Sequence, residues 1–160
     1  MKIDKFPRHK SSQGFIAAKY PTVLMYILSS LVLFIPYVGI FAWLIAFLFF
    51  FRESDSKFLR VHSAQNGFLL MLYSVVELIL SIIGGAILSS ANESMNQDAI
   101  ISALITQGNL GNAARIIRFI ILVINIVFVL LAYNYRFFNI PVLGKLAYRL
   151  HDRTDSGPLK

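Results

Sequence analysis

The stretch LFIPYVGIFAW, residues 33–43, decides the fold because it lies in the middle of a long apolar run. The run covers residues 22–51 and contains no charged residue. One membrane helix needs roughly 20 apolar residues and two need roughly 40, so this run is long for one span and short for two. Whether the chain reverses direction here therefore determines the topology of every later segment.

Composition places the chain in the class of membrane proteins. Of its 160 residues, 57% are hydrophobic and 14% are charged, which is more apolar surface than a soluble core of this size buries. The absence of Cys excludes disulfides and Cys-ligated metals. The net charge of +7 does not indicate nucleic-acid binding, because the Lys and Arg residues flank apolar runs and do not form one basic face.

Pro36 and Gly39 favour a break within the first apolar run. Proline removes a helical hydrogen bond and disfavours helix at the residue before it. We therefore expect a tight helical hairpin broken at Pro36, whereas the alternative is one long kinked helix. With two later apolar runs, this predicts an all-α membrane fold of four membrane helices, at about 15–34, 37–51, 67–89 and 116–134.

The positions of basic residues predict the side of the membrane on which each end lies. Five Lys or Arg residues precede the first run, three lie in the loop after the hairpin and five lie in the C-terminal tail. Cytoplasmic segments collect Lys and Arg, so we expect both termini on the cytoplasmic side. Arg115 and Arg118 remain for the opposite side. The first run lacks a small-residue cleavage site, so we interpret it as an uncleaved anchor.

Segments outside the four spans have patterns of their own. Their periodicity predicts amphipathic interfacial helices near 56–66, 95–106 and 141–150. For the second of these, an irregular loop is an equal alternative. The ends of the chain, 1–14 and 152–160, are expected to be disordered. The predicted organisation is thus a single membrane domain over residues 15–151.

A polar stripe runs from the loop after the hairpin into the third span. On a continuous helix, the side chains at these positions fall on or beside one face. The stripe consists of His62, Gln65, Asn66, Tyr73 and Glu77. Glu77 lies near the middle of its span, where acidic residues are rare and usually face protein or water. Asn125 has nearly the same depth in the oppositely directed last span, so we expect a Glu77–Asn125 hydrogen bond, with a proton or substrate role for Glu77 as the alternative.

The sequence contains no recognisable catalytic or cofactor-binding motif. It has no Gly-rich phosphate loop, H-E-x-x-H, G-x-S-x-G or usable pair of carboxylates, so we expect no enzyme activity and no cofactor. His62 has no second His or acid at ligand spacing, which argues against a metal site and for an anchoring role. Ser81, Gly85 and Ser89 form a small-xxx-small ridge, which favours close packing within the chain or with a second copy.

Two segments resemble a known family. FLRVHSAQN, residues 58–66, is similar to the F-L/V-R-x-H-x-x-Q-A/N segment of small bacterial membrane proteins grouped with the twenty-kilodalton component of the chloroplast inner-envelope import translocon. FNIPVLGKLA, residues 138–147, resembles the x-x-P-x-x-G-x-x-A ending of those bacterial proteins. The matching residues are Phe58, Arg60, His62, Gln65, Asn66, Pro141, Gly144 and Ala147.

The resemblance implies four helical spans, a bacterial inner membrane and, from the plant proteins, participation in preprotein translocation. The segment 91–115 is longer than in those relatives. Our leading hypothesis is a non-enzymatic scaffold or accessory subunit whose partners are the lipid bilayer and other membrane subunits or a second copy. The alternative is a small transporter or channel that uses Glu77 as a proton or cation site. We favour the scaffold, because the sequence has no internal repeat of the kind typical of transporters.

Overall fold

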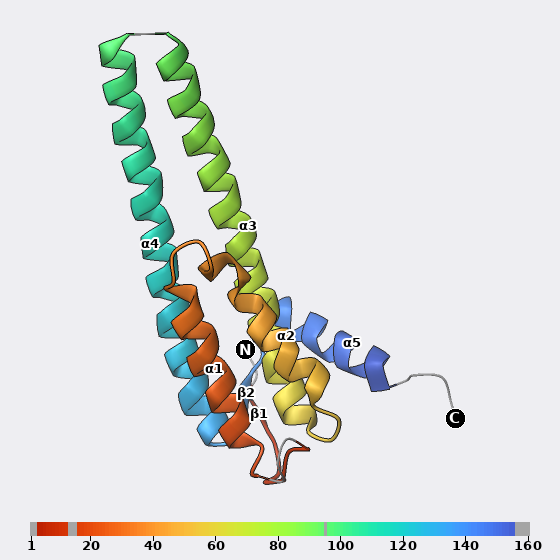
Figure 1. The fold of residues 1–160 in the computed structure, drawn as a ribbon. Coiled ribbons are helices and arrows are strands. Elements are labelled where there is room, and N and C mark those ends of the chain that lie inside the picture. Colours follow the sequence, from red (N-terminus) through yellow and green to blue (C-terminus); the bar gives the residue numbers. More distant parts are fainter. Residues whose placement is uncertain (1–2, 13–15, 95, 156–160) are drawn as a thin grey trace.

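The computed structural model describes residues 3–12, 16–94 and 96–155. Of the structure, 78% is helical, which fits the expected all-α class. The elements in chain order are β1 (Ile3–Lys5), α1 (Lys19–Leu33), η1 (Gly39–Phe41), α2 (Ala42–Arg52), α3 (Lys57–Glu93), α4 (Gln97–Tyr133), β2 (Arg136–Phe138) and α5 (Leu143–Asp155) (Figure 1).

α3 and α4 form a long antiparallel hairpin that determines the overall shape (Figure 1). Each has 37 residues, or about 55 Å at 1.5 Å per residue. Both are long and apolar enough to cross a membrane, whereas α1 and α2 are apolar but shorter. α1 and α2 pack along the lower half of the hairpin, and the upper halves of α3 and α4 project beyond them (Figure 1).

The first apolar run reverses direction between α1 and α2, as the sequence predicts. Tyr37 takes a left-handed conformation, with φ at 62°. The Gly39 N–H donates to the Ile35 carbonyl at 2.9 Å. A Cβ on Gly39 would lie 2.5 Å from the carbonyl oxygen of Leu33, so this turn closes only around a glycine. The reversal lets α1 and α2 lie side by side, which excludes the single kinked helix.

Two interfacial helices that were expected as separate elements are continuous with the long helices. Residues 56–66 supply the cap and first turns of α3, and 97–106 belong to α4. α4 also continues through Gly108 and Gly111, so the helix expected near 95–106 and the span expected at 116–134 are one helix without a break between them. A glycine in a helix costs only about 1 kcal/mol. Side chains of α4 pack beside Gly84 of α3, and this packing outweighs the weak tendency of the two glycines to end a helix.

The described part of the N-terminal tail is folded against the base of the molecule. β1 pairs antiparallel with β2, with Ile3 opposite Phe138. The ring of Phe6 lies 5.3 Å from that of Phe58. The disorder expected for residues 1–14 is therefore wrong for residues 3–12, while 1, 2, 13 and 14 lie outside the described residues. These contacts join segments far apart in the sequence, so no local pattern could predict them.

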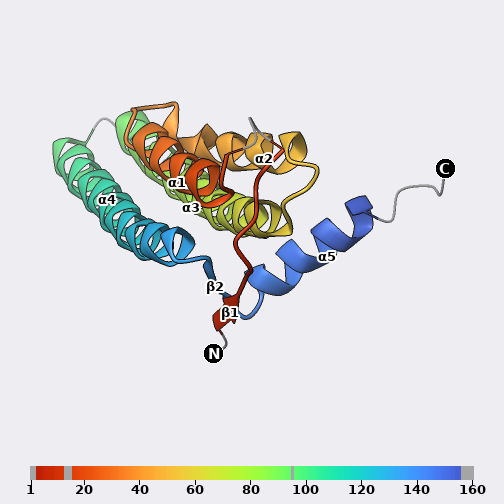
Figure 2. The same cartoon turned by 90° about the horizontal axis from the view of Figure 1, so that it is seen from below.

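α5 confirms the helix predicted near 141–150 and extends it to Asp155. It packs on α3, on the side of the hairpin opposite α1 and α2 (Figure 2). Ala147 is buried there, whereas Lys145 and Arg149 are exposed. Of the tail expected to be disordered at 152–160, the first four residues are helical and the others lie outside the described residues.

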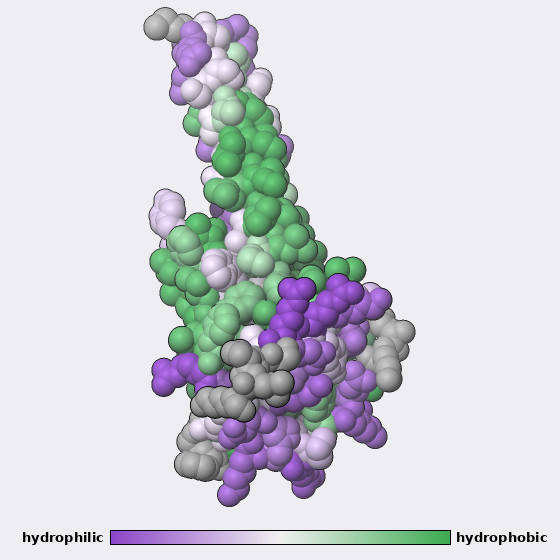
Figure 3. All heavy atoms as spheres, turned by 90° about the vertical axis from the view of Figure 1, so that its right-hand side faces the viewer, coloured by the Kyte–Doolittle hydropathy of each residue, from purple (hydrophilic) through white to green (hydrophobic). Residues whose placement is uncertain are grey.

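Hydropathy divides the molecule along its length. Hydrophobic side chains cover the shaft of the α3–α4 hairpin, and hydrophilic side chains gather at the base and at the tip (Figure 3). The base includes the N-terminal segment, the α2–α3 loop and α5 (Figure 1). The three basic segments of the sequence thus lie at the same end of the molecule.

A buried carboxylate ties the N-terminal segment to the α2–α3 loop. Glu53 is 3% exposed and accepts hydrogen bonds from the Ser11 hydroxyl, from the Ser12 N–H at 3.0 Å and hydroxyl at 2.9 Å, and from the Ser56 N–H at 2.8 Å. Burial raises the pKa of the Glu53 carboxyl, but these hydrogen bonds outweigh burial and leave its pKa below the ordinary value. Glu53 is therefore ionised in the folded protein.

We predict that Gly39→Ala lowers the free energy of unfolding by roughly 1–3 kcal/mol, because the new Cβ meets rigid backbone. The measurement is thermal or denaturant unfolding of the purified protein in detergent. Gly108→Ala is the matched control, since nothing lies within 4 Å of a Cβ there and alanine is the better helix former. Equal stability of Gly39→Ala and wild type would contradict the tight turn.

We also predict that Glu53 makes stability depend on pH. A carboxyl whose pKa is lowered by folding contributes stability that is complete above its unfolded pKa of about 4.3 and is lost as the pH falls through the folded pKa. Glu53→Gln should therefore be less stable than wild type at pH 7 and should lose less stability between about pH 5 and pH 3. Glu93→Gln, at an exposed position, should follow wild type. If the free energy of unfolding depended on pH in the same way in Glu53→Gln and in wild type, Glu53 would contribute nothing to the pH dependence.

Candidate functional site

The first turns of α3 form the most deeply buried part of the molecule. Every residue from 58 to 67 is buried, including the polar side chains of Arg60, His62, Gln65 and Asn66. α1, α2, β2 and α5 surround this segment, so it is not an amphipathic helix with a face open to lipid headgroups. Buried polar side chains are stable only with hydrogen-bonding partners, and these partners define what the segment does.

Gln65 clamps the connection between β2 and α5. Its Nε2 donates to the Phe138 carbonyl at 3.0 Å, and its Oε1 accepts from the Ile140 N–H at 3.3 Å. A Cβ on Gly144 would lie 3.1 Å from the same Oε1, so α5 approaches α3 closely because this residue has no side chain. The two sequence segments that carry the family resemblance therefore meet at Gln65.

Other residues of the two segments complete this joint. Phe58 and Ala147 are fully buried, and Pro141 is exposed just before α5. The guanidinium of Arg60 lies 4.9 Å from the centre of the Phe50 ring and donates to the Thr154 hydroxyl. Arg60 thereby links α3 to both α2 and α5.

His62 and Asn66 connect α3 to α1. His62 Nδ1 lies 2.9 Å from the Tyr26 hydroxyl, and the imidazole packs edge-on against Phe137. The Asn66 amide lies 3.3 Å from the sulfur of Met25. In the described chain, no group of three or more His, Asp or Glu side chains could hold a metal ion. The contacts of His62 and Asn66 are those of side chains that hold helices together.

Higher in the hairpin, the stripe ends in an ion pair. Arg118 of α4 donates through Nε to the Tyr73 hydroxyl at 2.6 Å and through Nη2 to Glu77 Oε1. The expected Glu77–Asn125 hydrogen bond is wrong, because Asn125 instead donates to the Ser30 hydroxyl of α1 at 3.0 Å. Arg118, expected on the outer side of the membrane, is the partner of Glu77.

The register of the hairpin explains this error. Two continuous helices joined by a short turn place Tyr73 beside Arg118, and Gly84 beside Gln107. Asn125 lies about two turns, or roughly 10 Å, below Arg118 along α4. The expected pairing compared the depths of Glu77 and Asn125 as counted from the start of each apolar run, with the two runs starting at opposite membrane surfaces. α3 and α4 extend well beyond those runs, so the count does not give the register.

The ion pair changes the chemistry available to Glu77. The side chains of Glu77 and Arg118 are 17% and 23% exposed, so both are largely shielded from solvent. The guanidinium of Arg118 compensates the Glu77 carboxylate for part of the hydration that it loses in the hairpin. A cavity of about 220 Å³ adjoins Glu77 between the two helices. This is below the roughly 300 Å³ at which small-molecule pockets begin.

We predict that the Glu77–Arg118 pair stabilises the hairpin. Glu77→Gln and Arg118→Gln should each lower the free energy of unfolding by roughly 3 kcal/mol, because each leaves a shielded charge without its partner. The double variant should lose less than the sum of the two, and unfolding in detergent measures all three. Arg115→Gln, at an exposed position three residues away, is the control and should stay within about 0.5 kcal/mol of wild type. Additive losses in the double variant would contradict a direct pair.

Comparison with known proteins adds no assignment: no family model, no curated protein and no solved structure matches this chain.

Proposed function

We propose that this protein is a non-enzymatic integral membrane scaffold or accessory subunit, whose α3–α4 hairpin contacts other membrane subunits or a second copy. One observation carries the proposal. The upper half of the hairpin extends beyond α1 and α2 (Figure 1), and its apolar side chains point outward. Ile82 of α3 and Ile105 of α4 are 62% and 61% exposed. Apolar surface of this extent requires lipid or a protein partner.

The proposal includes a location in a bacterial inner membrane with four membrane segments and both termini in the cytoplasm. The basic N-terminal segment, the α2–α3 loop and α5 all lie at the base, which supports a cytoplasmic base. The α1–α2 hairpin enters the bilayer from that side, and α3 and α4 cross it. A role in protein translocation is the finer form of the proposal, and its support is the sequence resemblance alone.

The small-residue ridge supports a partner outside the chain. Ser81, Gly85 and Ser89 are exposed, and a Cβ on Gly85 would meet no atom within 4 Å. The adjacent Gly84 is the residue that packs against α4. Ridges of small residues allow helices in membranes to approach closely. Ser81 also borders the cavity between α3 and α4, so the part of the ridge that is open to a helix of another subunit is at Gly85 and Ser89.

We predict a protein contact at this ridge. A photo-crosslinking amino acid in place of the exposed Ser89, in the full chain in its native membrane, should form an adduct with one defined membrane protein or with a second copy. Gly85→Leu should abolish the adduct, because the larger side chain blocks close helix approach. Gly108→Leu alters a matched exposed glycine on α4 and should leave the adduct unchanged. Adducts with lipid only would contradict the scaffold.

The alternative function, a transporter or channel that uses Glu77, is tested in the same protein. The cavity beside Glu77 is the observation that favours it, and the pairing of Glu77 with Arg118 opposes it. In liposomes that contain a pH-sensitive dye, we expect no proton flux from wild type or from Glu77→Gln. A proton or cation flux that wild type shows and Glu77→Gln lacks would overturn the scaffold proposal.

A further inference from the structure

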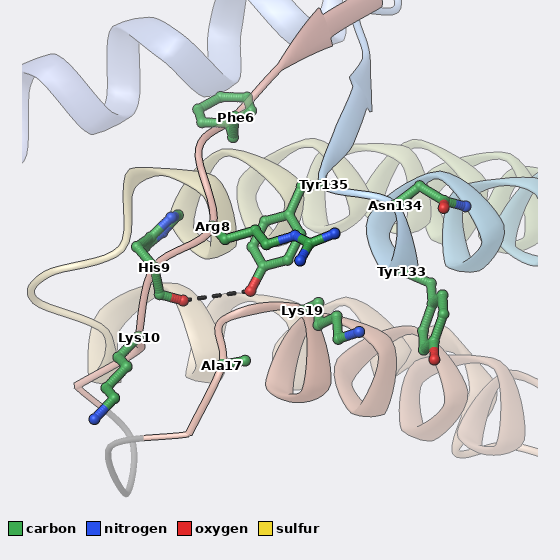
Figure 4. A pocket seen from close by; sticks show the side chains of 9 residues that line it. All are labelled: Phe6, Arg8, His9, Lys10, Ala17, Lys19, Tyr133, Asn134 and Tyr135. Atoms are coloured by element: carbon green, nitrogen blue, oxygen red, sulfur yellow. Dashed lines mark hydrogen bonds between the residues drawn. The ribbon is translucent and has the colours of Figure 1, made fainter.

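A basic pocket lies at the base, where the N-terminal segment crosses the start of α1 and the end of α4 (Figure 4). Its volume is about 560 Å³, which is within the range of sites for small molecules and headgroups. Its wall includes Arg8, Lys19 and the aromatic rings of Tyr133 and Tyr135. None of the joint residues around Gln65 lines this pocket, so it is a separate site.

Two cations share this pocket without an anion. The side chains of Arg8 and Lys19 extend into the same space, whereas Lys10 points away from it (Figure 4). Lys19 Nζ lies 4.1 Å from the centre of the Tyr133 ring, which holds the ammonium in place. Among the described residues, no acidic side chain lines the pocket, and neither Arg8 nor Lys19 forms an ion pair. Two neighbouring cations repel each other, so an anion between them is favoured.

An apolar groove continues upward from the pocket between the same two helices. Its volume is about 580 Å³, and its walls include Ile27 and Leu31 of α1 and Ile126 and Leu130 of α4. Tyr26 and Ser30, which also line the groove, lie on the same face of α1 as Lys19, because they follow it by 7 and 11 residues, or about two and three helical turns. Leu130 and Ile126 share a face of α4 with Tyr133, because they precede it by 3 and 7 residues, or about one and two helical turns. The pocket and the groove thus form one seam that changes from basic to apolar.

We propose that the α1–α4 seam binds one anionic phospholipid, with its phosphate between Arg8 and Lys19 and one acyl chain in the groove. The order of the seam matches a lipid in a cytoplasmic leaflet, whose phosphate lies at the surface and whose chains run toward the midplane. Arginine and lysine both bind phosphate oxygens, and the apolar walls exclude water from the chain. The site rests on the membrane placement proposed above but not on the scaffold role.

The headgroup is tested by native mass spectrometry of the full chain in mild detergent, with phosphatidylglycerol and phosphatidylcholine added. Wild type should retain one phosphatidylglycerol in preference to phosphatidylcholine. Arg8→Gln/Lys19→Gln should weaken that binding roughly 30-fold, whereas Arg8→Lys/Lys19→Arg keeps both charges and should bind like wild type. Lys145→Gln/Arg149→Gln removes two exposed charges of α5 and should have no effect. Equal weakening by both charge-removing pairs would indicate general surface attraction and overturn the site.

The acyl chain is tested in the same assay. Ile126→Trp fills the groove and should weaken phosphatidylglycerol binding, whereas Val127→Trp, at an exposed neighbour outside the groove, should not. Inorganic phosphate at millimolar concentration should not displace the lipid. Displacement by phosphate, with no effect of Ile126→Trp, would identify a free phosphate ligand and overturn the lipid proposal.

The membrane placement is measured in a separate experiment, so that a failure of this placement can be distinguished from a failure of the lipid site. Extraction of native membranes with alkaline carbonate should leave the protein in the membrane fraction. Release into the supernatant would overturn the membrane placement itself. Retention in the membrane, combined with no preference for phosphatidylglycerol, would overturn the lipid site alone.

Discussion

The rest of the structure depends on the close approach of Gly39 to the backbone of Leu33. This contact turns one apolar run into two short helices, and it returns the chain to the base before α3 begins. As a result, the α2–α3 loop lies next to the N-terminal segment, where Glu53 can accept the hydrogen bonds of Ser11 and Ser12. The same reversal leaves α1 beside α4, so the α1–α4 seam also follows from it.

The sequence predicts the helical class, the reversal and the two long apolar helices, because each depends on local composition or on a proline. It does not predict where those helices begin and end. Gly108 and Gly111 are ordinary signals for a helix end, and only the adjacent α3 makes a continuous α4 favourable. The fold of the N-terminal segment depends on β2 and on Phe58, which are remote in the sequence and leave no periodic signal.

In the candidate site, His62 and Asn66 are buried, but so is every residue from 58 to 67, so helical spacing alone does not single out their face. Their partners could not be predicted, because a pairing across two helices depends on their register as well as on residue type. One signal for Glu77 was present in the sequence. Arg118 lies near the start of the last apolar run. A guanidinium stabilises a carboxylate in an apolar environment more strongly than a neutral amide such as that of Asn125 does.

The base of the molecule and the upper half of the α3–α4 hairpin are held together to different extents. Buried polar contacts of Gln65, His62 and Arg60 join four elements at the base, so opening any one of them exposes several unsatisfied groups. In the upper half of the hairpin, α3 and α4 have only each other among the described residues, and local stability there rests on fewer contacts (Figure 1). Local opening of the tip would break none of the hydrogen bonds at the base. A hairpin that is fixed at its base and less constrained in its upper half suits the scaffold role that we propose.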